Sequence, residues 1–70
     1  MNLMMANLNK EYTIIGVNTE DEELNAFLFS LGCYSGEPMT VISRRRGGCT
    51  VSIKDGRDQI DKQLASAIRV

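Results

Sequence analysis

Apolar residues recur with a helical period between residues 20 and 31. Leu24, Phe27, Leu28 and Leu31 stand at positions i, i+3, i+4 and i+7, and this spacing places four side chains on one face of a helix. The pattern predicts an amphipathic helix from about Glu20 to Leu31 whose apolar face is buried.

Both ends of this predicted helix carry signals. Thr19 and Glu22 have the spacing of a capping box, and the acidic residues at positions 20–23 favour the positive end of a helix dipole. Gly32 is expected to end the helix, because glycine adopts the left-handed C′ conformation without steric cost. Cys33 is then placed to pack back onto the helix.

Beyond Gly32 the pattern changes to that of β-strands. The run from Cys49 to Lys54 alternates between apolar and polar residues, which is typical of a strand with one buried side. Gly47-Gly48 predicts a turn before this strand, and Asp55-Gly56 predicts a type I′ hairpin after it. Strands are expected over residues 12–17, 39–45 (opened by Pro38), 49–54, 57–60 and 68–70, with a helical turn over residues 61–67.

This order of elements predicts a mainly β fold with one inserted α-helix, arranged as a small SH3-like β-barrel. The 70 residues suffice for one small domain. We expect residues 1–7 to form a flexible N-terminal tail and residues 8–70 to form the folded domain. The chain shows neither the features of a signal peptide nor the run of roughly 18 apolar residues that spans a bilayer. We therefore expect a cytoplasmic protein with no direct membrane insertion.

Composition narrows the classes of function. The chain has 43% hydrophobic residues, 24% charged residues and a net charge of -1. This balance indicates an ordinary globular domain and argues against a nucleic-acid binder, which depends on cationic side chains to neutralise phosphates. The charge is uneven, however: residues 1–35 hold one Lys and five acids, whereas residues 36–70 hold seven basic residues and four acids. A positive patch is expected in the second half.

The residue types needed for metal binding or covalent catalysis are sparse. The chain has no histidine, and Cys33 and Cys49 are its only cysteines. Two cysteines cannot supply the four ligands of a structural zinc site, and a nucleophilic cysteine would lack a histidine base. We expect reduced thiols, with Cys49 in the core and Cys33 the more accessible of the two. We expect no catalytic residue, no metal and no cofactor.

Phe29 is the first candidate for contact with a partner. It lies well away from the face that Leu24 and Leu31 define on the predicted helix, and an outward aromatic residue is a natural anchor in a protein interface. The alternatives are that Phe29 is one of the isolated exposed apolar residues that are common on proteins, or that Met4 and Met5 cover this side chain.

The second candidate is the run Arg44-Arg45-Arg46, the densest cluster of charge in the chain. It lies at a predicted strand end, where it could bind an acidic protein surface, a phosphate or an anionic membrane face. A plainly solvated loop is the alternative. Because no aromatic residues interleave with the arginines to stack on bases, nucleic acid is not an expected partner.

The segment from Leu28 to Gly36 resembles the Leu-x-x-Leu-Gly-x-x-x-Gly signature of the FeoA family, small cytosolic partners of the bacterial ferrous-iron transporter FeoB. The end of the chain resembles the closing Ala-x-x-Ile-x-Val of that family, and the order of elements agrees over about residues 8–70. The chain departs from the family where Arg45 to Gly48 stand in place of a Gly-Asp-Pro loop. The matching residues, which the resemblance implies are structural, are Leu28, Leu31, Gly32, Gly36, Ala65, Ile68 and Val70.

The resemblance implies a non-enzymatic accessory protein of ferrous iron transport. Such a protein binds the cytoplasmic part of a FeoB-type transporter and reaches the membrane only through this partner. The transport context also associates the family with transition metal ion binding. One alternative is an SH3-like interaction module that works with a metal-dependent transcriptional regulator, since similar barrels occur as terminal domains of such repressors. Another is a generic anion-binding barrel.

Overall fold

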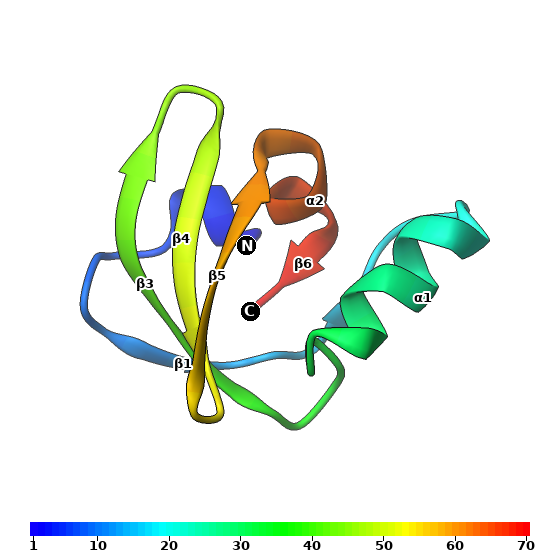
Figure 1. Cartoon of the computed structure of the whole chain (residues 1–70), viewed down its shortest axis with the longest axis horizontal. Helices are drawn as coiled ribbons and strands as arrows, with labels where there is room; N and C mark the ends of the chain where they lie inside the picture. Colours follow the sequence, from blue (N-terminus) through cyan, green and yellow to red (C-terminus); the bar gives the residue numbers. More distant parts are fainter.

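The strands of the computed structural model, which describes residues 1–70, form two antiparallel sheets (Figure 1). One sheet has the strand order β1-β3-β4-β5, and the other pairs β2 with β6. Helix α1 projects from one side of the molecule (Figure 1). The elements are η1 (Leu3–Met5), β1 (Glu11–Thr13), β2 (Gly16–Val17), α1 (Glu22–Ser30), β3 (Pro38–Arg45), β4 (Gly48–Ile53), β5 (Gly56–Asp61), α2 (Lys62–Ala67) and β6 (Ile68–Arg69). The predicted mainly β fold with an inserted helix is confirmed.

The predicted strand over residues 12–17 is divided between the two sheets, because β1 pairs with β3 whereas β2 pairs with β6. At the change of partner, the N–H of Ile14 donates to the carbonyl oxygen of Glu37 at 2.9 Å, and the N–H of Ile15 donates to that of Arg69 at 2.8 Å. Ile14 is buried and Ile15 is exposed. The prediction of one continuous strand is therefore wrong, since an apolar run does not reveal where its partner changes.

Strand β4 is an inner strand of the larger sheet, with β3 on one side and β5 on the other. Its predicted alternation is confirmed, because its three large apolar positions are all buried. The turn that follows differs from the prediction. Ile53 pairs with Gly56, so the two turn residues are Lys54 and Asp55. Of these only Lys54 has a positive φ, at +54°, and the predicted type I′ turn at Asp55-Gly56 is wrong.

The first seven residues belong to the folded unit. Leu3 and Ala6 are fully buried members of the core, and Asn2 forms a β-bridge with Arg69. The predicted flexible tail over residues 1–7 is therefore wrong. This segment carries the apolar side chains that cover one end of the core, so it is not free of the domain.

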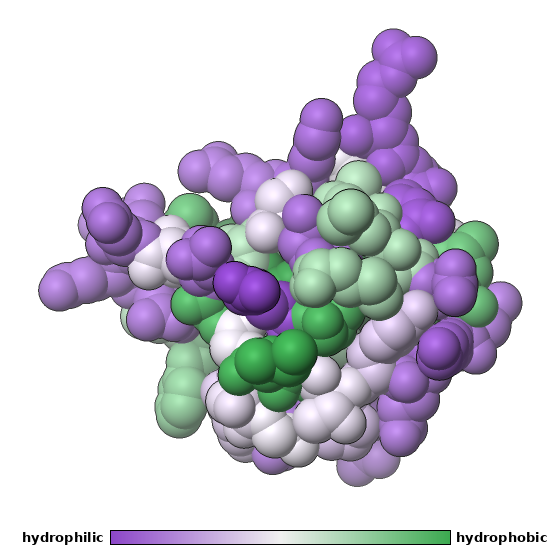
Figure 2. All heavy atoms as spheres, turned by 180° about the vertical axis from the view of Figure 1, so that it is seen from behind, coloured by the Kyte–Doolittle hydropathy of each residue, from purple (hydrophilic) through white to green (hydrophobic).

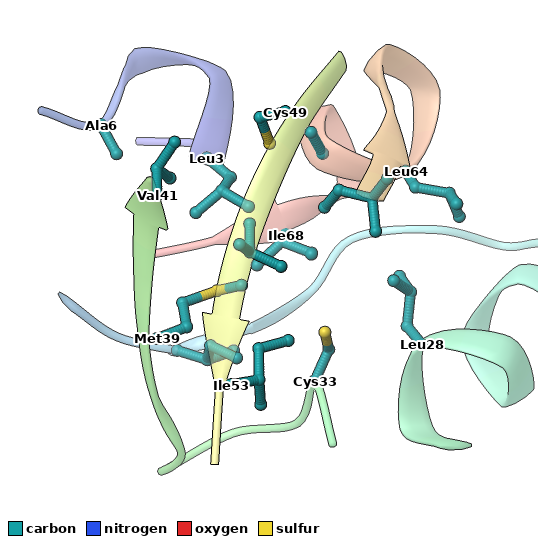
Figure 3. Packing of buried hydrophobic residues seen from close by; sticks show 14 residues of the cluster. Leu3, Ala6, Leu28, Cys33, Met39, Val41, Cys49, Ile53, Leu64 and Ile68 are labelled. Atoms are coloured by element: carbon teal, nitrogen blue, oxygen red, sulfur yellow. The ribbon is translucent and has the colours of Figure 1, made fainter. Parts of the chain in front are cut away.

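One core unites the two sheets and the helices. Figure 3 shows Leu28 extending from α1 toward Leu64, while Cys33 lies beside Ile53 at the end of β4. Leu28 is fully buried, and burying a leucine side chain contributes about 1.5–3 kcal/mol. Leu28 is thus the principal attachment of α1 to the sheets. The largest fully buried side chains are Leu3, Ile14, Leu28, Met39, Ile68, Val41, Val51 and Cys33.

Candidate partner-binding surfaces

Helix α1 begins two residues later than predicted, and Asp21 is its N-cap. The Oδ1 atom of Asp21 accepts hydrogen bonds from the N–H groups of Glu23 at 2.9 Å and Leu24 at 3.3 Å. Thr19 supports the cap indirectly, because its Oγ1 accepts from the N–H of Asp21 at 3.1 Å. The predicted capping box of Thr19 and Glu22 is wrong, since an aspartate caps as well as a threonine and here lies closer to the helix.

The other end of α1 is fixed by a Schellman motif. The N–H of Cys33 donates to the carbonyl oxygen of Leu28 at 2.8 Å, and the N–H of Gly32 donates to that of Phe29 at 3.0 Å. Gly32 has a φ of +92°, as its predicted role requires. A Cβ atom at Gly32 would lie 3.2 Å from the Cγ2 atom of Ile53. The end of the helix is therefore held closely against the end of β4.

Phe29 lies at this fixed end of α1 and is 65% exposed. Its ring stacks on Tyr34, with the ring centroids 4.9 Å apart. The Lys54 Nζ atom lies 5.3 Å from the centroid of the Tyr34 ring and 3.3 Å from Oε2 of Glu37. Hydrogen bonding to the Tyr34 side chain, followed by that to Glu37, raises the pKa of Lys54. We call these four residues the Phe29 cluster.

A shallow hollow of about 390 Å³ opens beside the Phe29 cluster and is lined by Phe29, Ser30, Leu31, Gly32, Tyr34 and Lys54. Sequence reasoning identified only Phe29 of this cluster. Tyr34 follows soon after the helix, but its contact with Phe29 depends on the turn at Gly32, and Lys54 comes from the distant β4–β5 turn. A cation beside an aromatic face is a pairing that sequence spacing does not reveal.

The predicted apolar face of α1 is buried at three of its four positions, wholly or in part. Leu28 is buried, and Leu24 and Leu31 are partly buried against the core. Phe27, however, is 48% exposed, so the predicted burial of all four apolar residues is wrong there. The helix contacts the sheets along a narrower strip than the period suggests. Because Phe29 is also exposed, the N-terminal methionines do not cover it.

The start of α1 is strongly acidic. Glu20, Asp21, Glu22 and Glu23 are all exposed, and the segment 20–31 contains no Lys or Arg. The one salt bridge of the structure joins Lys54 to Glu37. The four acidic side chains therefore have no cationic partner within the chain.

The arginine run is divided between structure and surface. The Nη1 atom of Arg44 donates to the carbonyl oxygens of Met4 at 2.8 Å and Ala6 at 2.6 Å. Its charge thus lies at the carbonyl end of η1, where a cation is favoured. Arg45 and Arg46 are exposed at the β3–β4 turn. Arg44 therefore holds the N-terminal segment, and two arginines remain for a partner.

A second hollow, of about 350 Å³, lies beside this turn. Its lining residues are Arg45, Gly47, Gly48, Cys49, Thr50, Gln59, Ile60 and Asp61. Gly48 is essential to its shape, because a Cβ atom there would meet the backbone of Ile60 and lie 2.8 Å from the Cα atom of Asp61. The strands pair closely at this point because Gly48 has no side chain.

The structure does not bring the two candidate contact sites together. Arg45 pairs with Gly48 at the start of β4, whereas Lys54 follows Ile53 at its end. Figure 1 shows the β3–β4 turn and the β4–β5 turn at opposite ends of the sheet. Six strand residues separate the two ends by about 17 Å. Phe29 and the exposed arginines therefore belong to two distinct surfaces.

The residues of the family signature lie in the core or at turns. Leu28, Ala65 and Ile68 are fully buried, while Leu31 and Val70 pack against the core from its edge. Gly32 and Gly36 have φ values of +92° and +93°. None of these residues forms an exposed chemical group.

Both cysteines are free and buried. Cys33, expected to be the more accessible thiol, is only 1% exposed, so that prediction is wrong. Burial, with a smaller contribution from the charge of Asp58, raises the pKa of Cys33 to about 11. Burial also raises the pKa of Cys49 against the opposing effect of Arg44. Neither thiol has the character of a nucleophile, which requires a lowered pKa.

Groups of metal-ligating side chains and membrane-spanning helices are both absent from the structure. It has no group of three or more His, Cys, Asp or Glu side chains placed to hold a metal ion. It has no helix with the length and apolarity needed to cross a membrane.

Two antiparallel sheets with an inserted helix and a short helical turn before β6 define a small SH3-like domain. The FeoA domain model matches residues 1–70, and the chain therefore belongs to the FeoA family. This family is associated with ferrous iron transport and is a non-enzymatic accessory domain. No curated protein sequence matches the chain.

Solved structures agree with this fold. An iron uptake regulatory protein (FeoA) has a TM-score of 0.87 and 19% identity, with 97% of this chain and 91% of that chain covered. Stenotrophomonas maltophilia FeoA complexed with zinc, described as a prokaryotic SH3 domain protein, has a TM-score of 0.84 and 16% identity, with 97% and 86% covered. A manganese-dependent transcriptional repressor has a TM-score of 0.88 and 20% identity, but this chain covers only 39% of it.

Proposed function

We propose that this chain is an accessory and regulatory protein of ferrous iron transport that binds the cytoplasmic part of a FeoB-type transporter. Membership of the FeoA family supports this proposal, and so does the character of the surface. The chain offers two candidate contact surfaces on a rigid fold, one at Phe29 at the end of α1 and the other at Arg45 and Arg46 in the β3–β4 turn, and the variants described below distinguish between them. The proposed protein works in the cytoplasm and reaches the membrane only through its partner.

The exposed aromatic group is the observation on which this proposal chiefly depends. A phenylalanine that is 65% exposed yet stacked on Tyr34 loses little side-chain entropy when it enters a partner's pocket, because its orientation is already restricted. Aromatic side chains of this kind dominate the energetics of interfaces. The transporter supplies the nucleotide chemistry, and this chain alters its assembly or activity by contact.

The test is a titration of the chain against the purified cytoplasmic GTPase domain of a FeoB-type transporter from the same genome, with and without guanine nucleotide. We expect saturable binding in at least one nucleotide state, measured by calorimetry. A matched cellular measurement is ferrous iron uptake after deletion of the gene. Absence of binding in every nucleotide state, together with unchanged uptake, would refute the proposal.

A second candidate function rests on the likeness to the manganese-dependent repressor, whose TM-score with this chain is 0.88. In this view the chain is an interaction module that works with a metal-dependent transcriptional regulator. Residues 1–70 contain no helix-turn-helix, so the DNA-binding part of such a regulator lies outside these residues. The neighbouring genes discriminate the two functions: a transporter with a GTPase domain favours the first, and a winged-helix repressor favours the second.

A further inference from the structure

We propose that one stripe of α1 is the surface through which this protein docks, and that its partner offers an apolar socket with a lysine or arginine about 10 Å away. The stripe consists of Glu22, Asn25, Ala26 and Phe29, which are all exposed and lie at i, i+3, i+4 and i+7 on one face. We call it the α1 stripe. This inference rests on the proposed function and identifies the contact surface and the chemistry of the partner.

The apolar end of the stripe is built to be rigid. The Schellman motif fixes the backbone of Phe29, and Tyr34 packs against its ring with the two ring centroids 4.9 Å apart. Tyr34 is in turn held by Lys54, and Lys54 by Glu37. The hollow of about 390 Å³ beside Phe29 leaves room for an apolar side chain of the partner. A helix that lays such an anchor into a groove is a recurring mode of recognition.

The other end of the stripe determines the charge of the partner. Glu22 is one of four exposed acids at positions 20–23 that have no cationic partner in the chain. Capping does not require all four acids, because Asp21 alone accepts hydrogen bonds from the N–H groups of Glu23 and Leu24. Glu22 lies seven residues before Phe29, and a helix rises 1.5 Å per residue, so the two groups are about 10 Å apart. A complementary partner therefore places its cation at this spacing from the socket.

The other exposed surfaces lack this combination. At the β3–β4 turn, Arg45 and Arg46 are charged but have no exposed large apolar residue among them. The face opposite to that of Figure 1 shows an apolar area ringed by hydrophilic side chains (Figure 2). None of the exposed large apolar residues outside α1 is aromatic; they are Met1, Met5, Leu8 and Ile15. Only α1 joins an exposed aromatic anchor to a block of unpaired charge.

The experiment compares matched variants in the titration against the purified cytoplasmic GTPase domain of the transporter. Phe29→Ala is expected to weaken binding at least 10-fold, whereas Phe27→Ala, an exposed phenylalanine of the same helix outside the stripe, is expected to change it less than 3-fold. Glu22→Lys is expected to slow association several-fold at low salt and to lose this effect at high salt, because screened charges no longer steer the encounter. Arg46→Glu is expected to leave the affinity within 3-fold.

Each outcome decides the question. The expected pattern supports the α1 stripe as the docking surface, provided that thermal unfolding shows each variant to be folded. If Phe29→Ala fails to fold, Phe29→Ser combined with the salt dependence of Glu22→Lys provides the same comparison. Equal effects of Phe29→Ala and Phe27→Ala, or loss of binding in Arg46→Glu alone, would overturn the inference while leaving the proposed function intact. If the unaltered chain does not bind in any nucleotide state, the inference about the α1 stripe is wrong, and unchanged iron uptake after deletion of the gene would refute the proposed function as well.

Discussion

Replacing Arg44 by alanine tests whether the arginine run is a contact surface or part of the fold. The Nη1 atom of Arg44 donates to the carbonyl oxygens of Met4 and Ala6, at 2.8 and 2.6 Å. A hydrogen bond to a charged group contributes about 1.5–3 kcal/mol when it is shielded, but this site is partly open to water, which can hydrate the carbonyls after substitution. We therefore expect Arg44→Ala to lower the free energy of unfolding by about 2 kcal/mol. In a domain of this size that corresponds to a fall in Tm of about 10 °C.

Urea denaturation followed by circular dichroism measures this effect, and Arg46→Ala is the matched control. Arg46 is exposed and has no hydrogen bond from its side chain, so its loss should change stability by no more than about 0.5 kcal/mol. Hydrogen exchange adds a local measurement. In Arg44→Ala the amides of η1 should exchange faster, because the segment is released from β3. Equal stability of the two variants, with unchanged exchange in η1, would show that the observed hydrogen bonds do not hold the N-terminal segment.

Three further changes test the backbone and the core. Gly48→Ala should lower the free energy of unfolding by about 3 kcal/mol or more, because the added Cβ meets the backbone of β5 and the φ of Gly48 is +157°. The control is Gly47→Ala, whose added Cβ has no neighbour within 4 Å and should lower it by about 0.5 kcal/mol. Similar Tm values of the two variants in thermal melts would contradict this prediction. Gly32→Ala and Gly36→Ala should each lower the free energy of unfolding by about 1 kcal/mol, because both glycines have a positive φ. The loss should be larger at Gly32, where neighbouring side chains lie 3.2 Å from the added Cβ. An equal loss of stability at both sites would argue against this contact. Burial raises the pKa of Cys33 from 9.0 to about 11. The unfolded chain therefore releases this proton first, and the free energy of unfolding should fall by up to about 2.5 kcal/mol as the pH rises from 9 to 11. Urea titrations of Cys33→Ala should show a flatter decline, and an unchanged decline would refute the assignment to Cys33.

Local signals in the sequence predicted the elements whose causes are local. The apolar period and Gly32 located α1 and its Schellman end, and alternation located β4. Where the cause is distant, prediction failed. The division of the first strand depends on which carbonyls Ile14 and Ile15 meet across the fold, and the burial of Leu3 depends on core side chains contributed by later strands. Neither partner is visible in the segment itself.

The candidate surfaces were likewise predictable only where their cause is local in the sequence. The outward position of Phe29 follows from helical geometry and was predicted, and its exposure confirms it. The structural role of Arg44 could not be predicted from the arginine run, because its acceptors, the carbonyl oxygens of Met4 and Ala6, are 40 and 38 residues away in the sequence. Phe27 shares the helical period with Leu24, Leu28 and Leu31, but it is 48% exposed whereas those leucines are buried or partly buried against the core. The width of the surface that receives a helix is a property of the whole fold.

The pairing of β2 with β6 has a consequence for how this domain is made. It joins Gly16 and Val17 to the last strand, and Met1 and Val70 form hydrogen bonds across a separation of 69 residues in the sequence. Contacts between such distant segments form slowly, because the entropy of closing the intervening chain is lost before the contact stabilises anything. The smaller sheet therefore cannot assemble on the ribosome until β6 has emerged. Until then the apolar side chains of β2 and η1 lack part of their cover, and apolar surface exposed in this way favours aggregation.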